Sequence, residues 1–381
     1  MRTPASVQRG LVKRGLVKRG LVKRAAVLLL VVLLALAPFT NRNLGGLLPG
    51  PINSAGSLQL LALMLVAAAT AVTLDVMFGY TGLLSFGHAL YFGFGCYSTV
   101  VLSNISSLGF AKGAVLAILL TFVVALAGNA ASLRLTGIGF SMATLALAQA
   151  LAIGVERGFL RSGGEVGVTY GFGVLPGPFV GIANTRNAYW LALALLLAVY
   201  ALCWLAVRTE AGHVWQAIRE NALRTRVLGY DVYVFQLGAG TIACTLAGAC
   251  GAVYSVVMGG ANPSIVVLGY SLSLVLMVAL GGRGVLWGAA LGGVLYTYLN
   301  QRLTALSDSA TVTGLPEVIR VPLTQPNFIL GVLFILIILF LPAGLASVLG
   351  IRRRPRAGRT DQKPRGAAPV PDDRREPALD G

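Results

Sequence analysis

The sequence predicts an all-α, polytopic membrane protein, and three observations indicate it. Of 381 residues, 56% are apolar and only 11% are Asp, Glu, Lys or Arg, whereas about a quarter of the residues in a soluble domain are charged. Residues 25–350 together hold 13 basic and 8 acidic side chains. The 48 glycines are typical of membrane helices that pack closely against one another.

Ten apolar runs approach the ~20 helical residues needed to cross a bilayer. The run at 268–281 is short, so we expect a partial or broken helix there. Pro38 disfavours signal-peptide cleavage after residues 35–37, so the first run is expected to be retained. The predicted spans lie near residues 25–40, 58–78, 83–103, 113–133, 137–155, 188–207, 234–258, 268–281, 285–301 and 327–349.

The positions of basic residues predict the topology. Arg134, Arg283 and four arginines of the loop 208–231 fall on the same side as both termini if there are ten spans. Basic residues favour the cytoplasmic side, so we expect both termini and the loop 208–231 to be cytoplasmic. Arg157, Arg161 and Arg186 fall on the other side, so the bias is not absolute.

Three regions are expected along the chain. Residues 1–24 form a basic arm containing GLVKR three times in tandem, and residues 351–381 form a basic tail rich in Arg, Pro, Asp and Gly. Both are expected to be disordered and cytoplasmic, and the arm could instead rest on anionic lipid. Residues 25–350 form the membrane domain. Basic residues that flank apolar runs, without interleaved aromatic residues, indicate contact with membrane lipid and not with nucleic acid.

Catalysis by this chain alone is not expected. Asp75 and Glu156 are isolated acids, and Asp75 with His88 is the only remote candidate for a catalytic pair. No phosphate-binding loop sequence is present. The four cysteines lie inside apolar segments and form no CxxC pair, so neither a metal site nor another cofactor site is predicted.

The stretch GYTGLLSFGHALYFGFGCYST, residues 79–99, is unusual for a membrane span. Its glycines allow close helix packing, or a break in a helix beside a polar path. His88 is either a hydrogen-bonded packing residue or a contact of the transported molecule, because an ionisable residue inside a membrane is a functional candidate. Gln149 either lines a path or bridges two helices. The candidate path residues are Ser85, His88, Tyr97 and Gln149.

Small residues spaced by four predict packing ridges. One such ridge is expected along Gly284, Gly288 and Gly292 on a single helical face, and another along residues 239, 243, 247 and 251. The glycines assigned to helix packing are Gly82, Gly87, Gly93, Gly95, Gly284, Gly288 and Gly292.

The cytoplasmic segment TEAGHVWQAIRENALRTRVLGYDV, residues 209–232, predicts a short amphipathic helix. Its apolar residues recur with near-helical spacing from Ala217 to Leu228. Gly229 is expected to end this helix. Such a helix could lie on the lipid surface or dock into another protein.

Several segments in their order along the chain resemble the permease subunits of branched-chain amino-acid ABC importers, the LivM type. They are the glycine-rich stretch and the amphipathic segment quoted above, FSMATLALAQAL, LAGACGAVYSVVMGGANPSIVVLGYSLSLVLMVALGGRGVLWGAALGG and FILGVLFILIILFLPAGL. The resemblance covers residues 58–349 approximately. It implies the fold of an ABC importer permease, located in the bacterial inner (plasma) membrane.

The resemblance also implies partners and roles. The chain would pair with a second permease subunit as a heterodimer, with two cytoplasmic ATPase subunits and with an extracytoplasmic solute-binding protein. The family's coupling segment, which docks into an ATPase, corresponds to Ile218, Arg219, Glu220, Asn221 and Gly229. Branched-chain amino acids are the expected cargo; urea or short amides are the alternative, and an ion-coupled secondary transporter is a further one.

Overall fold

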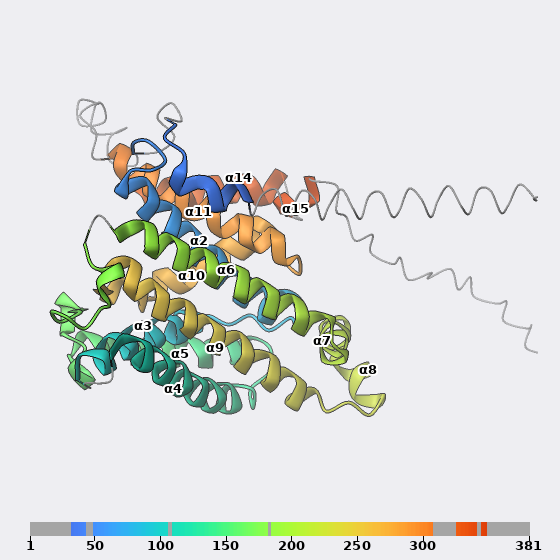
Figure 1. Cartoon of the computed structure of the whole chain (residues 1–381). Helices are drawn as coiled ribbons and strands as arrows, with labels where there is room; N and C mark the ends of the chain where they lie inside the picture. The colour runs from blue at the N-terminus through green and yellow to red at the C-terminus, as the bar shows by residue number, and fades with distance from the viewer. Residues whose placement is uncertain are drawn as a thin grey trace, which may run out of the picture.

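The computed structural model describes residues 32–42, 49–105, 109–181, 184–307, 325–340 and 344–348. The predictions for the arm at 1–24 and the tail at 351–381 lie outside the described residues. In the described part, nearly all regular structure is helical (Figure 1), which confirms the all-α prediction.

Within the described residues, each predicted apolar run contains a helix. The first run is helical from residue 32 and ends in the 3₁₀ turn η1 (Ala37–Phe39). The others are α2 (Ala55–Asp75) with its π-helical extension η2 (Val76–Tyr80), α3 (His88–Ile105), α4 (Gly109–Ser132), α5 (Ile138–Glu156), α6 (Thr185–Arg208), α9 (Val232–Met258), α10 (Leu268–Gly281), α11 (Leu286–Ser307) and α14 (Pro326–Phe340). The short α15 (Leu345–Val348) follows.

Five of the described helices are long and apolar enough to cross a membrane by length and composition: α2 with η2, α4, α5, α6 and α9. Helix α10 has 14 residues and is the short helix that the sequence predicts. The chain is thus a polytopic helical membrane protein, and ten crossings stays a prediction.

Helix α2 occupies the centre of the bundle. It packs against α6, α9, α10 and α11, while α3 packs against α9 and α4. Most of α2 is buried, whereas only a minority of the residues of α4, α5 and α6 are buried. The exposed residues of α4 include Val115, Leu119 and Val123; large apolar side chains on an outer face suit contact with lipid.

Glycines set the closest helix contacts. Gly95 of α3 lies against the backbone of Gly248 in α9, and Gly251 of α9 lies against the carbonyl of Phe92. Gly293 of α11 lies against Ala68 of α2. Backbones can approach this closely only where no side chain stands between them.

Gly95→Ala is therefore expected to destabilise the bundle by about 1–3 kcal/mol, the usual cost of overpacking. The added methyl group would overlap the carbonyl group of Gly248, which belongs to backbone and cannot rotate away. Thermal unfolding of the purified protein in detergent measures the change. Gly238→Ala on α9 is the matched control, because nothing lies within 4 Å of the added carbon; equal melting temperatures for the two variants would contradict the expectation.

The end of the bundle opposite α7 and α8 carries the longer connections (Figure 1). Between α5 and α6 come η3 (Phe159–Arg161), η4 (Gly164–Val166), β1 (Val168–Thr169) and η5 (Gly177–Phe179); β2 (Gly260–Ala261) and η7 (Pro263–Ile265) follow α9. Strands β1 and β2 pair antiparallel, with Val168 opposite Ala261. Next to them, Tyr170 Oη lies 2.6 Å from Ser255 Oγ, and burial raises the pKa of the Tyr170 hydroxyl.

Candidate functional site

The segment between α6 and α9 forms two helices and not the single helix predicted around residues 217–229. These are α7 (Glu210–Glu220) and α8 (Ala222–Val227). Asn221 separates them in an extended conformation (φ −162°, ψ 101°), and its Oδ1 accepts a hydrogen bond from Arg224 N at 2.8 Å. Asparagine favours this arrangement because its side chain caps the N-terminus of a helix well, whereas asparagine is unfavourable inside a helix. Gly229, with φ of 92°, follows α8 in the left-handed conformation suited to a helix end.

Helix α7 is anchored to the bundle by its apolar side. Val214 and Ile218 pack with Val232 of α9, and Ile218 is only 4% exposed. Trp215 Nε1 donates a hydrogen bond to the Phe235 carbonyl at 2.9 Å. Ile218 therefore faces its own chain, and the position of α7 is fixed relative to α9.

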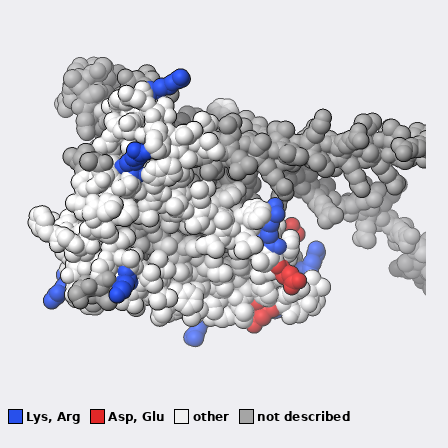
Figure 2. All heavy atoms as spheres, viewed as in Figure 1, with Lys and Arg blue, Asp and Glu red and all other residues white. Residues whose placement is uncertain are grey.

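Helix α8, in contrast, presents apolar side chains to the outside. Leu223 is 72% exposed, Val227 81% and Leu228 70%. We call these three residues the α8 patch. Arg224, Arg226 and Glu220 around it are exposed, and the acidic side chains visible in Figure 2 gather over α7 and α8. An apolar patch with a charged rim is the composition of a protein-binding surface.

Arg219 joins α7 to the ends of three membrane helices. It donates a hydrogen bond to the carbonyl of Gly79 in η2. Gly284, in the turn between α10 and α11, lies beside the Arg219 guanidinium and donates its N–H to Asp75 Oδ1 at 2.7 Å. We call Asp75, Gly79, Arg219 and Gly284 the junction. Because α11 begins at Leu286, Gly284 is not on the helical ridge predicted for it; its φ of 76° places it in the turn instead.

The predicted span at 83–103 begins later than expected, at His88. Gly82, with φ of 78°, stops helical continuation, and residues 81–87 run without regular structure. Ser141 of α5 donates a hydrogen bond to the Leu84 carbonyl at 2.6 Å, and Ser85 Oγ accepts one from Gly87 N at 3.1 Å. Non-helical backbone at membrane depth requires such side-chain partners. Gly82 and Gly87 are therefore in a helix break: Gly82 lies beside Arg219 and Gly87 against Thr144.

His88 takes part in a buried polar chain across four helices. Thr73 Oγ1 donates to the Thr70 carbonyl at 2.7 Å, so its single proton is used and it accepts from His88 Nε2 at 2.9 Å. The other ring nitrogen, Nδ1, lies 4.0 Å from Cys244 Sγ, which also accepts from Asn129 Nδ2 at 3.6 Å. These contacts join α2, α3, α9 and α4 and favour the packing interpretation of His88. Its nitrogens face groups other than Asp75, so the two do not form a catalytic pair.

None of the four candidate path residues lines the cavity described below. Ser85 lies in the helix break, and His88 is buried between helices. Tyr97 is buried, with no hydrogen-bond partner for its hydroxyl among the described residues. Gln149 is half-buried on α5. Of the remaining packing glycines, Gly93 lies against Val266, and Gly288 and Gly292 of α11 lie against the α10 backbone.

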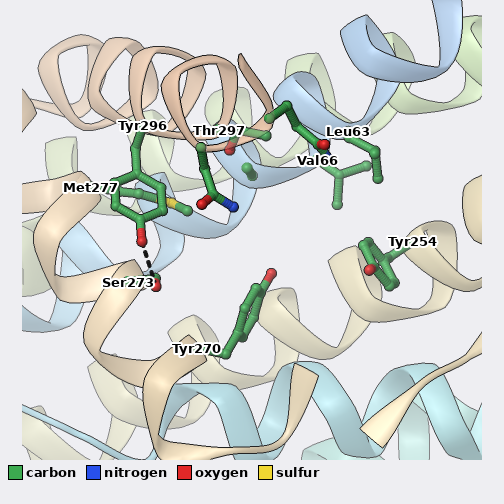
Figure 3. Close-up of a pocket in the computed structure, with 11 residues that line it drawn as sticks. Leu63, Val66, Tyr254, Tyr270, Ser273, Met277, Tyr296 and Thr297 are labelled. Carbon is green, nitrogen blue, oxygen red and sulfur yellow. Dashed lines mark hydrogen bonds between the residues drawn. The ribbon is translucent and has the colours of Figure 1, made fainter. Parts of the chain in front are cut away.

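A cavity of about 160 Å³ lies between α2, α9, α10 and α11 (Figure 3). Its lining includes Leu63, Val66, Tyr254, Tyr270, Ser273 and Tyr296. Ser273 Oγ donates to the Gly269 carbonyl at 2.9 Å and accepts from Tyr296 Oη at 2.7 Å. Sequence reasoning missed this cavity and two junction residues, Asp75 and Gly79. The signal for Asp75 was its isolation as an acid inside an apolar run; polar residues at 296–301 were the signal for the cavity.

Metal binding finds no support among the described residues, where no three His, Cys, Asp or Glu side chains come close enough to hold an ion. The four cysteines are free and buried.

Comparisons with known proteins agree with this architecture. A sequence model of the family described as "Branched-chain amino acid transport system / permease component" matches residues 56–341. The high-affinity branched-chain amino acid transport system permease protein LivM of Salmonella typhimurium is 25% identical over 268 residues, which cover 64% of this chain and 62% of the relative. LivM of Escherichia coli is 24% identical over 268 residues, which again cover 64% of this chain and 62% of the relative.

A third relative is the probable branched-chain amino acid transport permease protein LivM of Methanocaldococcus jannaschii, 24% identical over 316 residues, which cover 72% of this chain and 88% of the relative. The chain thus spans somewhat under two thirds of the length of the two enterobacterial relatives. No solved structure matches the chain significantly. The family match covers most of the chain and agrees with the helical membrane architecture; the chain belongs to the family of permease components of branched-chain amino acid transport systems.

Proposed function

We propose that this chain is the permease subunit of an ABC importer that moves branched-chain amino acids across a bacterial plasma membrane. It pairs with a second permease subunit, receives cargo from an extracytoplasmic binding protein and is driven by two partner ATPases. The end that carries α7 and α8 faces the cytoplasm, together with both termini. Transport is by alternating access, in which ATPase movement is passed to the membrane helices as rigid-body motion.

The pair α7–α8 carries this proposal. The α8 patch offers an exposed apolar surface, while α7 is held to α9 by Ile218 and Trp215 and to η2 by Arg219. A force applied to the α8 patch would therefore pass through α7 to α2, α9 and the α10–α11 turn. A secondary transporter would have no use for such an element.

Reconstitution tests the proposal. In proteoliposomes that contain this chain, the second permease and both ATPases, with the binding protein added outside, we expect leucine uptake that needs ATP inside and is unaffected by collapsing ion gradients. Vesicles without the ATPases are the control. Uptake against a gradient in that control would refute the proposal, and uptake of urea in preference to leucine would assign the cargo to the alternative class.

A further inference from the structure

We propose that the cavity between α2, α9, α10 and α11 is a binding site in this chain for the cargo, a zwitterionic amino acid with an aliphatic side chain. This inference rests on the proposed function and adds the place and chemistry of recognition within the membrane domain. With α7–α8 on the cytoplasmic side, α11 runs outward from Leu286, so the cavity residues 296–301 lie in the middle and outer part of the membrane.

The lining combines apolar and polar groups. Leu63 and Val66 of α2 and Met277 of α10 are apolar. Hydroxyl and carboxamide groups come from Tyr254, Tyr270, Ser273, Tyr296, Thr297 and Asn300. In Figure 3, Tyr270 directs its hydroxyl into the space between the helices. Ligand sites combine apolar walls with a few polar groups in this way.

The polar groups are at a depth where they must face water or protein. A polar side chain inside the bilayer is costly unless it faces the bundle interior or a hydrated cavity. Thr297 and Asn300 are half-buried, so their open side is expected to face a water-filled path or the second permease subunit and not lipid.

The cavity is closed toward the cytoplasmic side by close backbone packing. One turn below it, Gly292 lies against the Met277 carbonyl, and Gly288 lies against Gly281. Gly293 lies against Ala68 of α2. The same helix thus lines the cavity with its outer half and seals it with its inner half. A solute in the cavity could pass inward only after α10 and α11 separate.

The lining also distinguishes between classes of cargo. Among the described residues no charged side chain lines the cavity, so a net charge on the ligand would be desolvated without a partner. A zwitterion is neutral overall, and its two ends can be hydrogen-bonded by hydroxyl and amide groups. The apolar residues of the lining favour a ligand with an aliphatic side chain, which urea lacks. A cavity of ~150 Å³ holds a benzene-sized molecule, so about 160 Å³ accommodates a side chain with four carbons.

Cysteine labelling tests this inference on the full complex in membrane vesicles. Thr297→Cys places a thiol in the cavity wall, and the four native cysteines are buried, so the unmodified chain should give no background. A hydrophilic, membrane-impermeant thiol reagent is added from the extracytoplasmic side without ATP, and labelling is measured on the tagged, purified chain. Leu291→Cys, an exposed apolar position on the same helix, is the matched control and should not react because it faces lipid.

We expect Thr297→Cys to be labelled, and leucine at ten times its half-saturating concentration to slow the labelling by about tenfold, as simple occupancy requires. Urea at equal concentration should have no effect. Absence of labelling, labelling that leucine does not slow, or protection by urea instead of leucine would each overturn the inference. ATP-dependent leucine uptake by the unmodified complex is measured in parallel; if uptake is present and protection absent, this inference alone fails, whereas loss of uptake in the unmodified complex is the failure of the proposed function.

Discussion

Replacing Leu223 and Val227 by aspartate should abolish ATP-driven uptake and release the ATPases from the complex. Both side chains are exposed in this chain alone, so the membrane domain should fold and insert normally. In the complex each would be a buried apolar contact, and truncating a contact of this kind commonly costs ~2 kcal/mol or more. Two buried charges should lower the affinity at least ~100-fold. Co-purification of the ATPases with the tagged chain measures the loss.

The matched control for this pair is His213→Asp. His213 is exposed on α7, outside the α8 patch, and the substitution adds a negative charge to the same cytoplasmic segment. ATPase binding should persist in this variant. If L223D/V227D retains its ATPases, the α8 patch is not the docking surface and the proposed function loses its main support.

Arg219→Ala should uncouple transport from ATP hydrolysis, leaving the ATPases bound. The guanidinium forms the hydrogen bond from α7 to the Gly79 carbonyl, and hydrogen bonds to charged groups contribute about 1.5–3 kcal/mol. Losing that link should reduce the amount of leucine transported per ATP by about 10- to 100-fold. The measurement is the ratio of uptake to phosphate release in the same proteoliposomes.

Two companion variants make this second test specific. Glu210→Gln changes an exposed residue at the opposite end of α7, outside the coupling segment, and should keep the ratio. Arg219→Lys keeps a donor but not the planar guanidinium, so its ratio should fall between those of the alanine variant and the unmodified chain. An unchanged ratio in Arg219→Ala would mean that motion reaches the bundle by another contact, such as that of Ile218 with Val232.

The lengths of the apolar runs predicted most of the helices correctly, because a membrane-spanning helix needs apolar side chains along its length however the helices are arranged. Helices α4, α6 and α9 begin and end within four residues of the predicted runs. The sequence left open whether the glycines of residues 79–99 pack helices or break one, because a glycine with positive φ, such as Gly82, looks the same in sequence as a packing glycine. Gly284 was placed on a helix for the same reason.

The candidate site was predicted only in part. The segment 209–232 was recognised, but its helical periodicity concealed the separation at Asn221, which turns Ile218 inward and Leu223 outward. The spacing of residues in the sequence indicates which side chains share a face of one helix, but not which helices pack together. The contact of Arg219 with Gly79 and the cavity between α2, α9, α10 and α11 could therefore be found only from the tertiary structure.

The shortness of α10 has a consequence for the bilayer itself. Fourteen residues span ~21 Å, while the hydrocarbon layer is ~30 Å thick. The chain before α10 bends at η7, where Ile265 and Val266 are buried, and so fills the missing length with protein. At its outer end α10 is therefore continued by the buried irregular backbone of η7, so that lipid does not need to thin or reach inward to match the shorter helix.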